Sequence, residues 1–335
     1  MNKTNKITLG GIKEAYKKLN IPGIAWSVVV LFVFFSLMNS RFVSPYNLML
    51  ILRNTCTLLL TSTGLSLVIL MGKNDISVGS VVSMSAVVTA LLVNAGAPLI
   101  LVILLPLVMG IAIGATNGFL VAKLKFDYWV VAFSSMSIFA GLALVAAKGE
   151  TVSFKNNILD YIGNGKIAGL YVIIWVTAVL VGIMIWIQKK TKFGSDIYSI
   201  GGSENVAAVS GVKVVKVRII AYAISGLFAA IAGLAIACMT NSGSPNVGVD
   251  YSFNAMAAVV IGGTSFSGGK GSISGTVLGA LLMRILASGL SLMGIESTWQ
   301  KAITGLVIVS LIVIDVLNER RKNIKGLRRV YNHVA

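Results

Sequence analysis

Hydrophobic residues in this 335-residue chain are gathered into long runs, and short polar segments separate one run from the next. An α-helix needs about 20 apolar residues to cross the hydrocarbon core of a bilayer. The pattern therefore predicts ten membrane-spanning helices. They are expected at residues 21–39, 47–71, 77–94, 98–122, 129–147, 169–188, 218–239, 251–266, 272–293 and 300–317. The third and eighth runs are short, so each is either a span or a partly re-entrant segment.

The amino-acid composition points to the same class of protein. Hydrophobic residues make up 56% of the chain and charged residues only 12%, far from the balance of an ordinary soluble domain. We expect an all-α integral membrane protein. Its transmembrane domain would cover residues 21–317, between a basic N-terminus at 1–20 and a basic tail at 318–335.

The basic residues predict the orientation in the membrane. With ten spans, 21 of the 28 Lys and Arg residues fall on the side that holds both ends of the chain, and 6 fall on the other. The positive-inside rule then places both termini in the cytoplasm. Because these residues punctuate hydrophobic runs and form no basic face on a folded domain, the net charge of +17 does not indicate a nucleic-acid partner.

The ten spans also suggest an internal symmetry. Two sets of five spans would lie in opposite orientations, as in transporters that are built from inverted repeats. Each half carries glycine at every fourth position, a spacing that lets two helix backbones approach closely in lipid. These glycines are Gly110, Gly114 and Gly118 in one half and Gly271, Gly275 and Gly279 in the other.

Few residues suit catalysis or metal binding. Cys56 and Cys238 lie far apart in apolar runs, and the single histidine, His333, lies in the basic tail. These positions predict neither a disulfide framework nor a metal site, and they remove histidine-based chemistry from consideration. We therefore expect a protein that is not an enzyme.

The stretch "GGTSFSGGKGS" at 262–272 looks at first like a phosphate-binding loop. Thr264 stands where the first glycine of that motif belongs, and Gly271 follows the lysine where Ser or Thr should bind magnesium. The stretch also joins two predicted membrane helices. We interpret it as a tight, close-packed cytoplasmic turn and expect no ATP bound by this chain.

Ionisable groups are rare within the predicted spans. Asp75, Asp250, Glu296 and Asp315 fall at or near span ends, which leaves ion-coupled transport little to use. Arg284 is the exception, since it lies in the middle of a span. It either pairs with protein groups in a structural role or lines a polar pathway.

The longest polar connection covers residues 189–217 and contains the segment "SENVAAVSG". Ser203 is placed to cap a short helix there. Val206, Ala207 and the residues at 209–212 would leave an apolar face exposed on this loop. The segment is therefore either a solvated basic loop or a docking helix for a cytoplasmic partner.

Several segments taken together resemble the permease subunit of ABC importers of the ribose and related sugar class, within the branched-chain amino acid/ribose permease superfamily. The resemblance covers most of residues 45–317. It is carried by "NDISVGSVVSMSAV", "SMSIFAGLALV", "FGSDIYSIGGSENVAAVSGVKV", "AAVVIGGTSFSGGKGSISGTVLGALL" and "WQKAITGLVIVSLIVIDV", in this order. It implies a paired membrane subunit that receives solute from an extracytoplasmic binding protein and is driven by cytoplasmic ABC ATPase subunits.

By this resemblance, the 201–211 segment engages the ATPase. The residues assigned to this docking are Gly201, Gly202, Glu204, Asn205, Ala207, Ser210 and Gly211. The family often has two successive acids followed by two alanines in this segment. Here Asn205 replaces the second acid and Val206 replaces the first alanine.

The polar stretch "NDISVGS" at 74–80 resembles another signature of the family, matched at Asp75, Ser77, Val78, Gly79 and Ser80. Lys73 and Asn74 depart from it. Asn74 or Asp75 is placed to cap the first turn of a membrane helix, where backbone N–H groups lack partners. The alternative is a direct role in the polar path of the solute.

The sequence therefore predicts a permease of the bacterial plasma membrane that moves a monosaccharide such as ribose, or a similar small polar solute, by alternating access. ATP and Mg²⁺ would be used by the partner ATPase, with no cofactor bound by this chain. The expected partners are the ATPase, the binding protein, membrane lipid and a second permease, either a copy or a paralogue. The alternative function is an autonomous channel or secondary carrier for a small polar solute.

Overall fold

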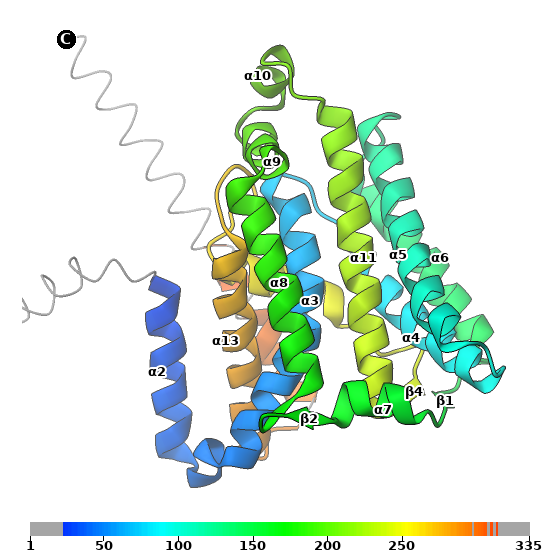
Figure 1. The fold of residues 1–335 in the computed structure, drawn as a ribbon. Coiled ribbons are helices and arrows are strands. Elements are labelled where there is room, and N and C mark those ends of the chain that lie inside the picture. Colours follow the sequence, from blue (N-terminus) through cyan, green and yellow to red (C-terminus); the bar gives the residue numbers. More distant parts are fainter. Residues whose placement is uncertain (1–22, 297, 307–308, 311–312, 314–335) are drawn as a thin grey trace, which may run out of the picture.

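The helices of this protein run roughly side by side and end at two opposite faces (Figure 1). The computed structural model describes residues 23–296, 298–306, 309–310 and 313. Helices α9 (Lys192–Gly202) and α10 (Glu204–Val209) lie at one end, which we call the α9–α10 face. Helix α7 (Asn157–Asn164) lies at the other end, the α7 face. The basic-residue count predicts that the α9–α10 face lies in the cytoplasm.

Six of the described helices are long and apolar enough to cross a membrane. These are α3 (Pro45–Leu70), α5 (Leu99–Ala122), α6 (Tyr128–Ala146), α8 (Val172–Lys190), α11 (Val214–Thr240) and α13 (Ile273–Leu292). Shorter apolar helices are α2 (Gly23–Met38), α4 (Val78–Asn94) and α12 (Tyr251–Ile261). The prediction of an all-α, multi-pass membrane protein is confirmed.

The predicted runs agree with the observed helices to within a few residues up to α13. Of the last run, 300–317, the residues at 298–306 are helical, and part of the remainder lies outside the described residues. The basic ends at 1–20 and 318–335, and with them the assignment of both termini to the cytoplasm, also lie outside the described residues.

Helices α4 and α12 begin inside the molecule. After α3 reaches the α9–α10 face, the chain turns back into the interior through residues 71–77 before α4 starts. After α11 reaches the α7 face, residues 244–250 return to the interior before α12 starts. At about 1.5 Å per residue, the 11 residues of α12 extend roughly 16 Å, about half of a hydrocarbon core. The short eighth run is thus a half-helix that is entered through a series of turns at 245–250.

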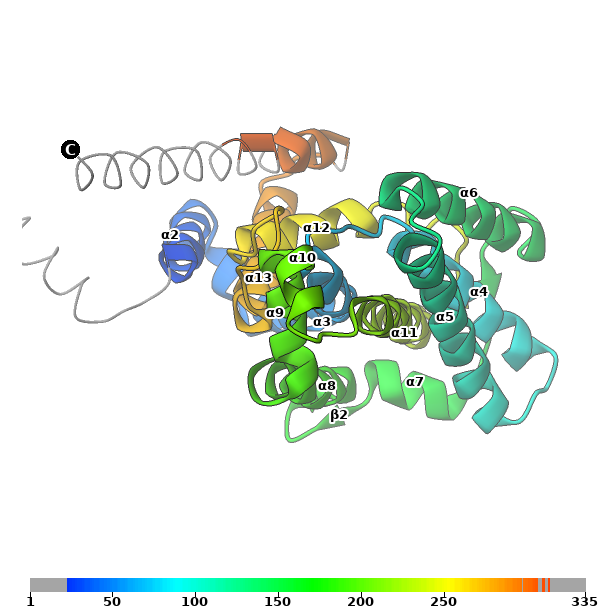
Figure 2. The ribbon, with the colours of Figure 1, turned by 90° about the horizontal axis from the view of Figure 1, so that it is seen from above.

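Helix α11 lies at the centre of the molecule, against α3, α4 and α5 (Figure 2). The first glycine ladder makes this packing close, because a Cβ at Gly110, Gly114 or Gly118 would lie within 2.9 Å of atoms of α11. The second ladder likewise brings α13 close to the end of α12. A Cβ at Gly275 or Gly279 would lie 2.0 or 1.9 Å from a carbonyl oxygen at the end of α12. Five of the six ladder glycines lie on helix-packing surfaces, as the spacing predicts, whereas Gly271 precedes α13 and packs against Thr264 of the turn.

The turn at 262–272 packs against the ends of α3 and α9. The amide of Gly269 donates to the carbonyl oxygen of Leu70 at 2.8 Å. Gly268 and Gly269 have φ of 83° and 71°, which a residue with a side chain rarely adopts. The interpretation of this stretch as a close-packed turn is confirmed.

The α7 face holds small elements that the sequence analysis did not predict. They are the 3₁₀-helix η1 (Ser40–Val43), α7, and the strands β1 (Val152–Ser153), β2 (Lys166–Ile167), β3 (Leu170–Tyr171) and β4 (Ser242–Gly243). Strand β1 pairs antiparallel with β4, and β2 with β3. Asp160 of α7 accepts hydrogen bonds from Asn241 and Asn164, which hold the pKa of its carboxyl below the ordinary value.

Candidate functional site

The N-terminal ends of α4 and α12 meet in the interior and exchange hydrogen bonds. The amide of Gly79 donates to Ser252 Oγ at 2.9 Å, and the amide of Gly248 donates to Ser83 Oγ at 2.9 Å. Ser252 Oγ in turn donates to the carbonyl oxygen of Ile76 at 2.6 Å. Each of the two helices therefore supplies a serine that satisfies a backbone N–H of the other segment: Gly79 in the first turn of α4, and Gly248 just before α12. We call this contact the half-helix junction.

Two glycines make the half-helix junction possible. A Cβ at Gly248 would lie 1.8 Å from the carbonyl oxygen of Gly79, and a Cβ at Gly79 would lie 2.3 Å from that of Gly248. These distances are far below any real van der Waals contact. The junction therefore has no room for a methyl group on either side.

The carboxylate of Asp75 is buried beside the half-helix junction. Its Oδ1 accepts from the Ser77 amide at 3.0 Å and from Ser77 Oγ at 2.5 Å. Asn117 of α5 donates to Ser77 Oγ at 2.9 Å, and Tyr222 of α11 donates to the carbonyl oxygen of Asn74 at 3.1 Å. The signature segment thus joins α4 to α5 and α11.

Helix α4 is capped differently from the sequence-based expectation. Its N-cap is Ser77, and no side chain at the N-cap bonds to the first turn. Asp75 bonds to the N-cap residue itself, while the first-turn amide of Gly79 is satisfied by Ser252, 173 residues away. Residues 74–77 turn back onto themselves, so the carboxylate does not reach the helix amides. The expected cap from Asn74 or Asp75 is therefore corrected.

The signature residues lie in the protein core. Asp75, Ser77 and Ser80 are each at most 5% exposed, and Gly79 is also buried. Ser80 Oγ donates to the carbonyl oxygen of Ser77 at 2.7 Å. In the described residues, none of these four lines either of the polar cavities that border Arg284.

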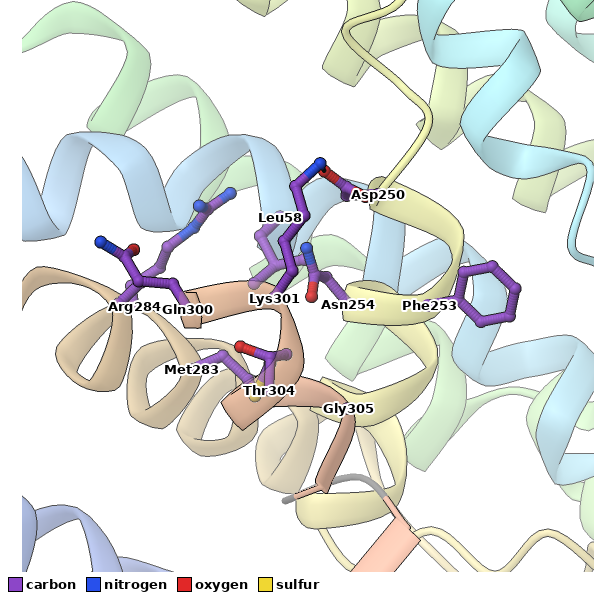
Figure 3. Close-up of a pocket in the computed structure, with 11 residues that line it drawn as sticks. Leu58, Asp250, Phe253, Asn254, Met283, Arg284, Gln300, Lys301, Thr304 and Gly305 are labelled. Carbon is purple, nitrogen blue, oxygen red and sulfur yellow. Dashed lines mark ion pairs between the residues drawn. The ribbon is translucent and has the colours of Figure 1, made fainter. Parts of the chain in front are cut away.

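Arg284 lies between two polar cavities of about 370 and 460 Å³. Figure 3 shows one of them, with Asp250, Arg284, Gln300 and Lys301 brought together by α12, α13 and residues 298–306. Asn254 and Thr304 add further polar groups to the same cavity. Arg284 and Gln300 also border the second cavity, to which Asn54 of α3 contributes.

The guanidinium of Arg284 has no carboxylate partner among the described residues. It lies 5.8 Å from the ring centre of Tyr251, and its Nη2 donates to the Tyr251 hydroxyl at 3.3 Å. Its Nε is buried without a hydrogen-bond partner. The nearby carboxylate of Asp250 pairs with Lys301 at 2.9 Å. A membrane-embedded arginine with unused donors at a cavity can bind an oxygen-rich solute.

At the α9–α10 face, α10 forms the short helix that the sequence predicts, and Ser203 is its N-cap. Val206 and Val209 are 63% and 88% exposed, so the helix presents an apolar surface. Gly202, Glu204, Asn205, Ser210 and Gly211 are exposed as well.

Two residues assigned to docking face this chain instead. Ala207 is 3% exposed and belongs to the hydrophobic core. A Cβ at Gly201 would lie 1.9 Å from the carbonyl oxygen of Leu70, so this glycine is needed for the contact between α9 and the end of α3. The assumption that Ala207 is exposed was wrong, because it lies on the side of the short helix α10 that faces the protein.

An ion pair ties α10 to α11. Arg218 is only 4% exposed, and it donates to both carboxylate oxygens of Glu204, at 2.7 and 3.3 Å. The hydrogen bond from Arg218 lowers the pKa of the Glu204 carboxyl, and the charges of Arg218, Lys73 and Lys125 act in the same direction. Sequence reasoning missed this partner, because the two residues belong to different helices.

The lowered pKa predicts a pH dependence. A carboxyl whose folded-state pKa lies below its unfolded value stabilises the fold above the unfolded value, here near 4.5, and the contribution is lost as pH falls through the folded value. We expect the midpoint of thermal unfolding in detergent to fall less steeply below about pH 4.5 for Glu204→Gln than for the wild type. Glu150→Gln, an exposed carboxyl in a turn, is the control. Equal slopes for Glu204→Gln and the wild type would contradict the role of the pair.

Known proteins resemble this chain over most of its length. The model of the family described as branched-chain amino acid transport system / permease component matches residues 47–312. A ribose import permease protein of Haemophilus influenzae is 34% identical over 293 residues, which cover 86% of this chain and 91% of that protein. No solved structure matches the chain.

Two other relatives bear related names. The ribose import permease protein of Bacillus subtilis is 35% identical over 289 residues, covering 85% of this chain and 89% of the relative. The autoinducer 2 import system permease protein of Escherichia coli is 33% identical over 289 residues, covering 86% and 84%. The family match and these identities show that the chain belongs to the branched-chain amino acid transport system / permease component family.

Proposed function

We propose that this chain is the permease subunit of an ATP-driven (ABC) sugar importer in the bacterial inner membrane. One observation carries the proposal: curated permeases named for ribose import match this chain over about nine tenths of their own length. The long apolar helices agree with a multi-pass membrane protein. The expected solute is a monosaccharide such as ribose or a similar small polar molecule, and the chain itself is a transport subunit without enzymatic chemistry.

The source of energy would be a separate ATPase chain that uses ATP and Mg²⁺. Its docking site on this chain would be α10, because Val206 and Val209 are exposed there on a polar face. Glu204 pairs with Arg218 of α11, so a movement of α10 would be transmitted through this ion pair to the central helix. The α7 face would receive solute from the binding protein.

A second permease, either a copy or a paralogue, would complete the pathway. Helices α6 and α12 and the described helical residues near the C-terminus lie along one side of the molecule, opposite α7 and α8 (Figure 2). Phe253 and Trp299 are 53% and 65% exposed on this side. A subunit contact on this side would cover the cavity that borders Arg284.

The arrangement of the half-helices supports an inverted repeat with ten spans. Helices α3 and α11 run in opposite directions. Each is followed by a connection that returns to the interior, a helix that begins there (α4 or α12) and a long helix with a glycine ladder. The reciprocal serine-to-amide bonds at the half-helix junction have the form that a two-fold axis in the membrane plane would produce. Alternating access would rock the two repeats about this junction.

The path of the solute would pass Arg284, while Asp75, Ser77, Gly79 and Ser80 would hold the repeats together. Sugar hydroxyls are good acceptors for the unused guanidinium donors of Arg284. Asn54, Asn254 and Gln300 add donors and acceptors to the two adjoining cavities. The buried signature residues have partners within the protein, which supports a structural role for them.

The docking proposal predicts the effect of a charge on α10. Val209→Asp should remove most of the ATPase that co-purifies with the chain and most of the solute uptake, because an unpaired charge would be buried at the interface. Val209 is 88% exposed, so the variant should fold and insert normally. The measurement is the ratio of ATPase to tagged chain after mild-detergent purification.

Ile158→Asp is the matched control. Ile158 is 55% exposed and lies on α7, at the opposite face, so this variant should retain the ATPase. Normal ATPase recovery with Val209→Asp would remove α10 as the docking site. Recovery of the wild-type chain without any ATPase, in several detergents and with nucleotide present, would favour the autonomous channel or carrier.

A further inference from the structure

An apolar groove opens at the α9–α10 face, between the end of α5 and the start of α11. Its volume is about 710 Å³. Its apolar lining runs from Phe119, Ile219 and Ile220, deeper along α5 and α11, out to Ala208, Val212, Val214 and Val215. Lys123, Lys213 and Lys216 also line it. We call it the α5–α11 groove. Ala208 of α10 borders it, but the residues proposed above for ATPase docking and for the solute path do not line it.

The deeper apolar residues of the groove lie inside the ends of two helices that are long and apolar enough to cross a membrane. Phe119 comes three residues before the end of α5, and Ile219 and Ile220 come five and six residues after the first residue of α11. At about 1.5 Å per residue, they lie roughly 5–9 Å inside the helix ends. Phe119 and Ile220 are 38% and 37% exposed, so this surface is available to a ligand in the membrane.

The polar rim of the groove is purely basic. Lys123, Lys213 and Lys216 are exposed, and no acidic residue lines the groove. No side chain caps the start of α11, so its first amides add partial positive charge. The nearest acid on α10, Glu204, is held by Arg218. The rim therefore suits an anionic group.

We propose that the α5–α11 groove binds an anionic phospholipid of the cytoplasmic leaflet. Its phosphate would lie among Lys123, Lys213 and Lys216, and an acyl chain would lie along Phe119, Ile219 and Ile220. An acidic head joined to an apolar chain at this depth matches both parts of the groove. A soluble ATPase docked on α10 would reach the lysines and the outer apolar residues beside Ala208, but not Phe119, Ile219 and Ile220 inside the helix ends. A second copy would bring the same net charge of +17, which opposes association at a basic rim.

The test compares two triple variants with equal loss of charge. Lys123→Gln, Lys213→Gln and Lys216→Gln together remove the basic rim. Lys189→Gln, Lys190→Gln and Lys192→Gln remove three charges from the same face, outside the groove. Each delipidated full chain receives phosphatidylglycerol or phosphatidylcholine in detergent, and bound lipid is counted by native mass spectrometry. The assay uses neither solute nor ATPase, so its result is independent of the proposed transport function.

The wild type and the control triple should each bind one phosphatidylglycerol in preference to phosphatidylcholine. Their affinity for phosphatidylglycerol should be at least tenfold higher than that of the groove triple. Ile220→Trp, which fills the apolar part, should weaken binding while the rim is intact. Inorganic phosphate at millimolar concentration should not displace the lipid. Equal lipid binding by both triples, or equal loss in both, would overturn the proposal. The proposal would also be overturned if the ATPase or a second copy of the chain protected the groove lysines from acetylation and the lipid did not.

Discussion

Gly248→Ala is expected to greatly reduce the fraction of molecules that fold, although it adds only a single methyl group. The new Cβ would lie 1.8 Å from the carbonyl oxygen of Gly79, so the half-helices must separate. Overpacking alone costs about 1–3 kcal/mol. Separation would also break the two serine-to-amide bonds, and each buried amide left without a partner costs a further 1–3 kcal/mol or so. The measurement is the yield of monodisperse protein and its thermal unfolding midpoint in detergent.

Gly182→Ala is the matched control, since a Cβ at this helical glycine of α8 meets nothing within 4 Å. It should be neutral or slightly stabilising, because alanine favours a helix over glycine by about 1 kcal/mol. Ser83→Ala and Ser252→Ala should lie between the two glycine variants, because they remove one and two hydrogen bonds respectively without a clash. If Gly248→Ala unfolds at the same temperature as Gly182→Ala, the close approach at the junction is refuted.

Hydropathy was enough to predict the helices, because the need to satisfy backbone groups in lipid leaves few alternatives to a helix. It also revealed the half-helix α12 as an unusually short run, at 251–266. The glycine ladders were predictable for a related reason. Their spacing of four places the glycines on one face of a helix, where only a close neighbour explains them. In both cases the signal is local in the sequence.

Contacts between distant segments were not predictable from one sequence. Asp75 is well placed in the sequence to cap α4, yet Ser252 supplies the bond to the Gly79 amide. Nothing local distinguishes Ser252 from other serines. The small elements at the α7 face were missed because strands of two residues have too little pattern to detect.

The docking segment shows the same limit on a smaller scale. The sequence revealed the capped helix and its apolar character, but not which side of it faces the protein. Ala207 faces the core, while Val206 and Val209 face outward. In a helix of 6 residues, periodicity is too short to fix an orientation, and the Glu204–Arg218 ion pair, invisible in the sequence, helps to determine it.

Arg284→Met should reduce solute uptake at least tenfold and at the same time stabilise the chain. A hydrogen bond from a charged donor contributes about 1.5–3 kcal/mol, which corresponds to roughly a 10- to 150-fold effect on binding. The guanidinium has no carboxylate partner among the described residues, and its Nε is unsatisfied. Insertion of a central arginine costs about 2.5–3.5 kcal/mol on translocon scales, so its removal should relieve a cost. Uptake of a radiolabelled pentose or hexose that the wild type carries is measured beside the unfolding midpoint.

The direction of the stability change separates the two roles that the sequence left open for Arg284. If Arg284 has a structural role, through its bond to Tyr251, Arg284→Met should lower uptake and stability together. Arg284→Lys keeps the charge but loses the planar array of guanidinium donors, so it should retain only part of the wild-type uptake. Lys166→Gln, a loss of charge on the β2–β3 hairpin away from the cavities, should change neither quantity. A residue that costs stability and still supports uptake is retained for the solute, because the fold alone would be better served by an apolar side chain.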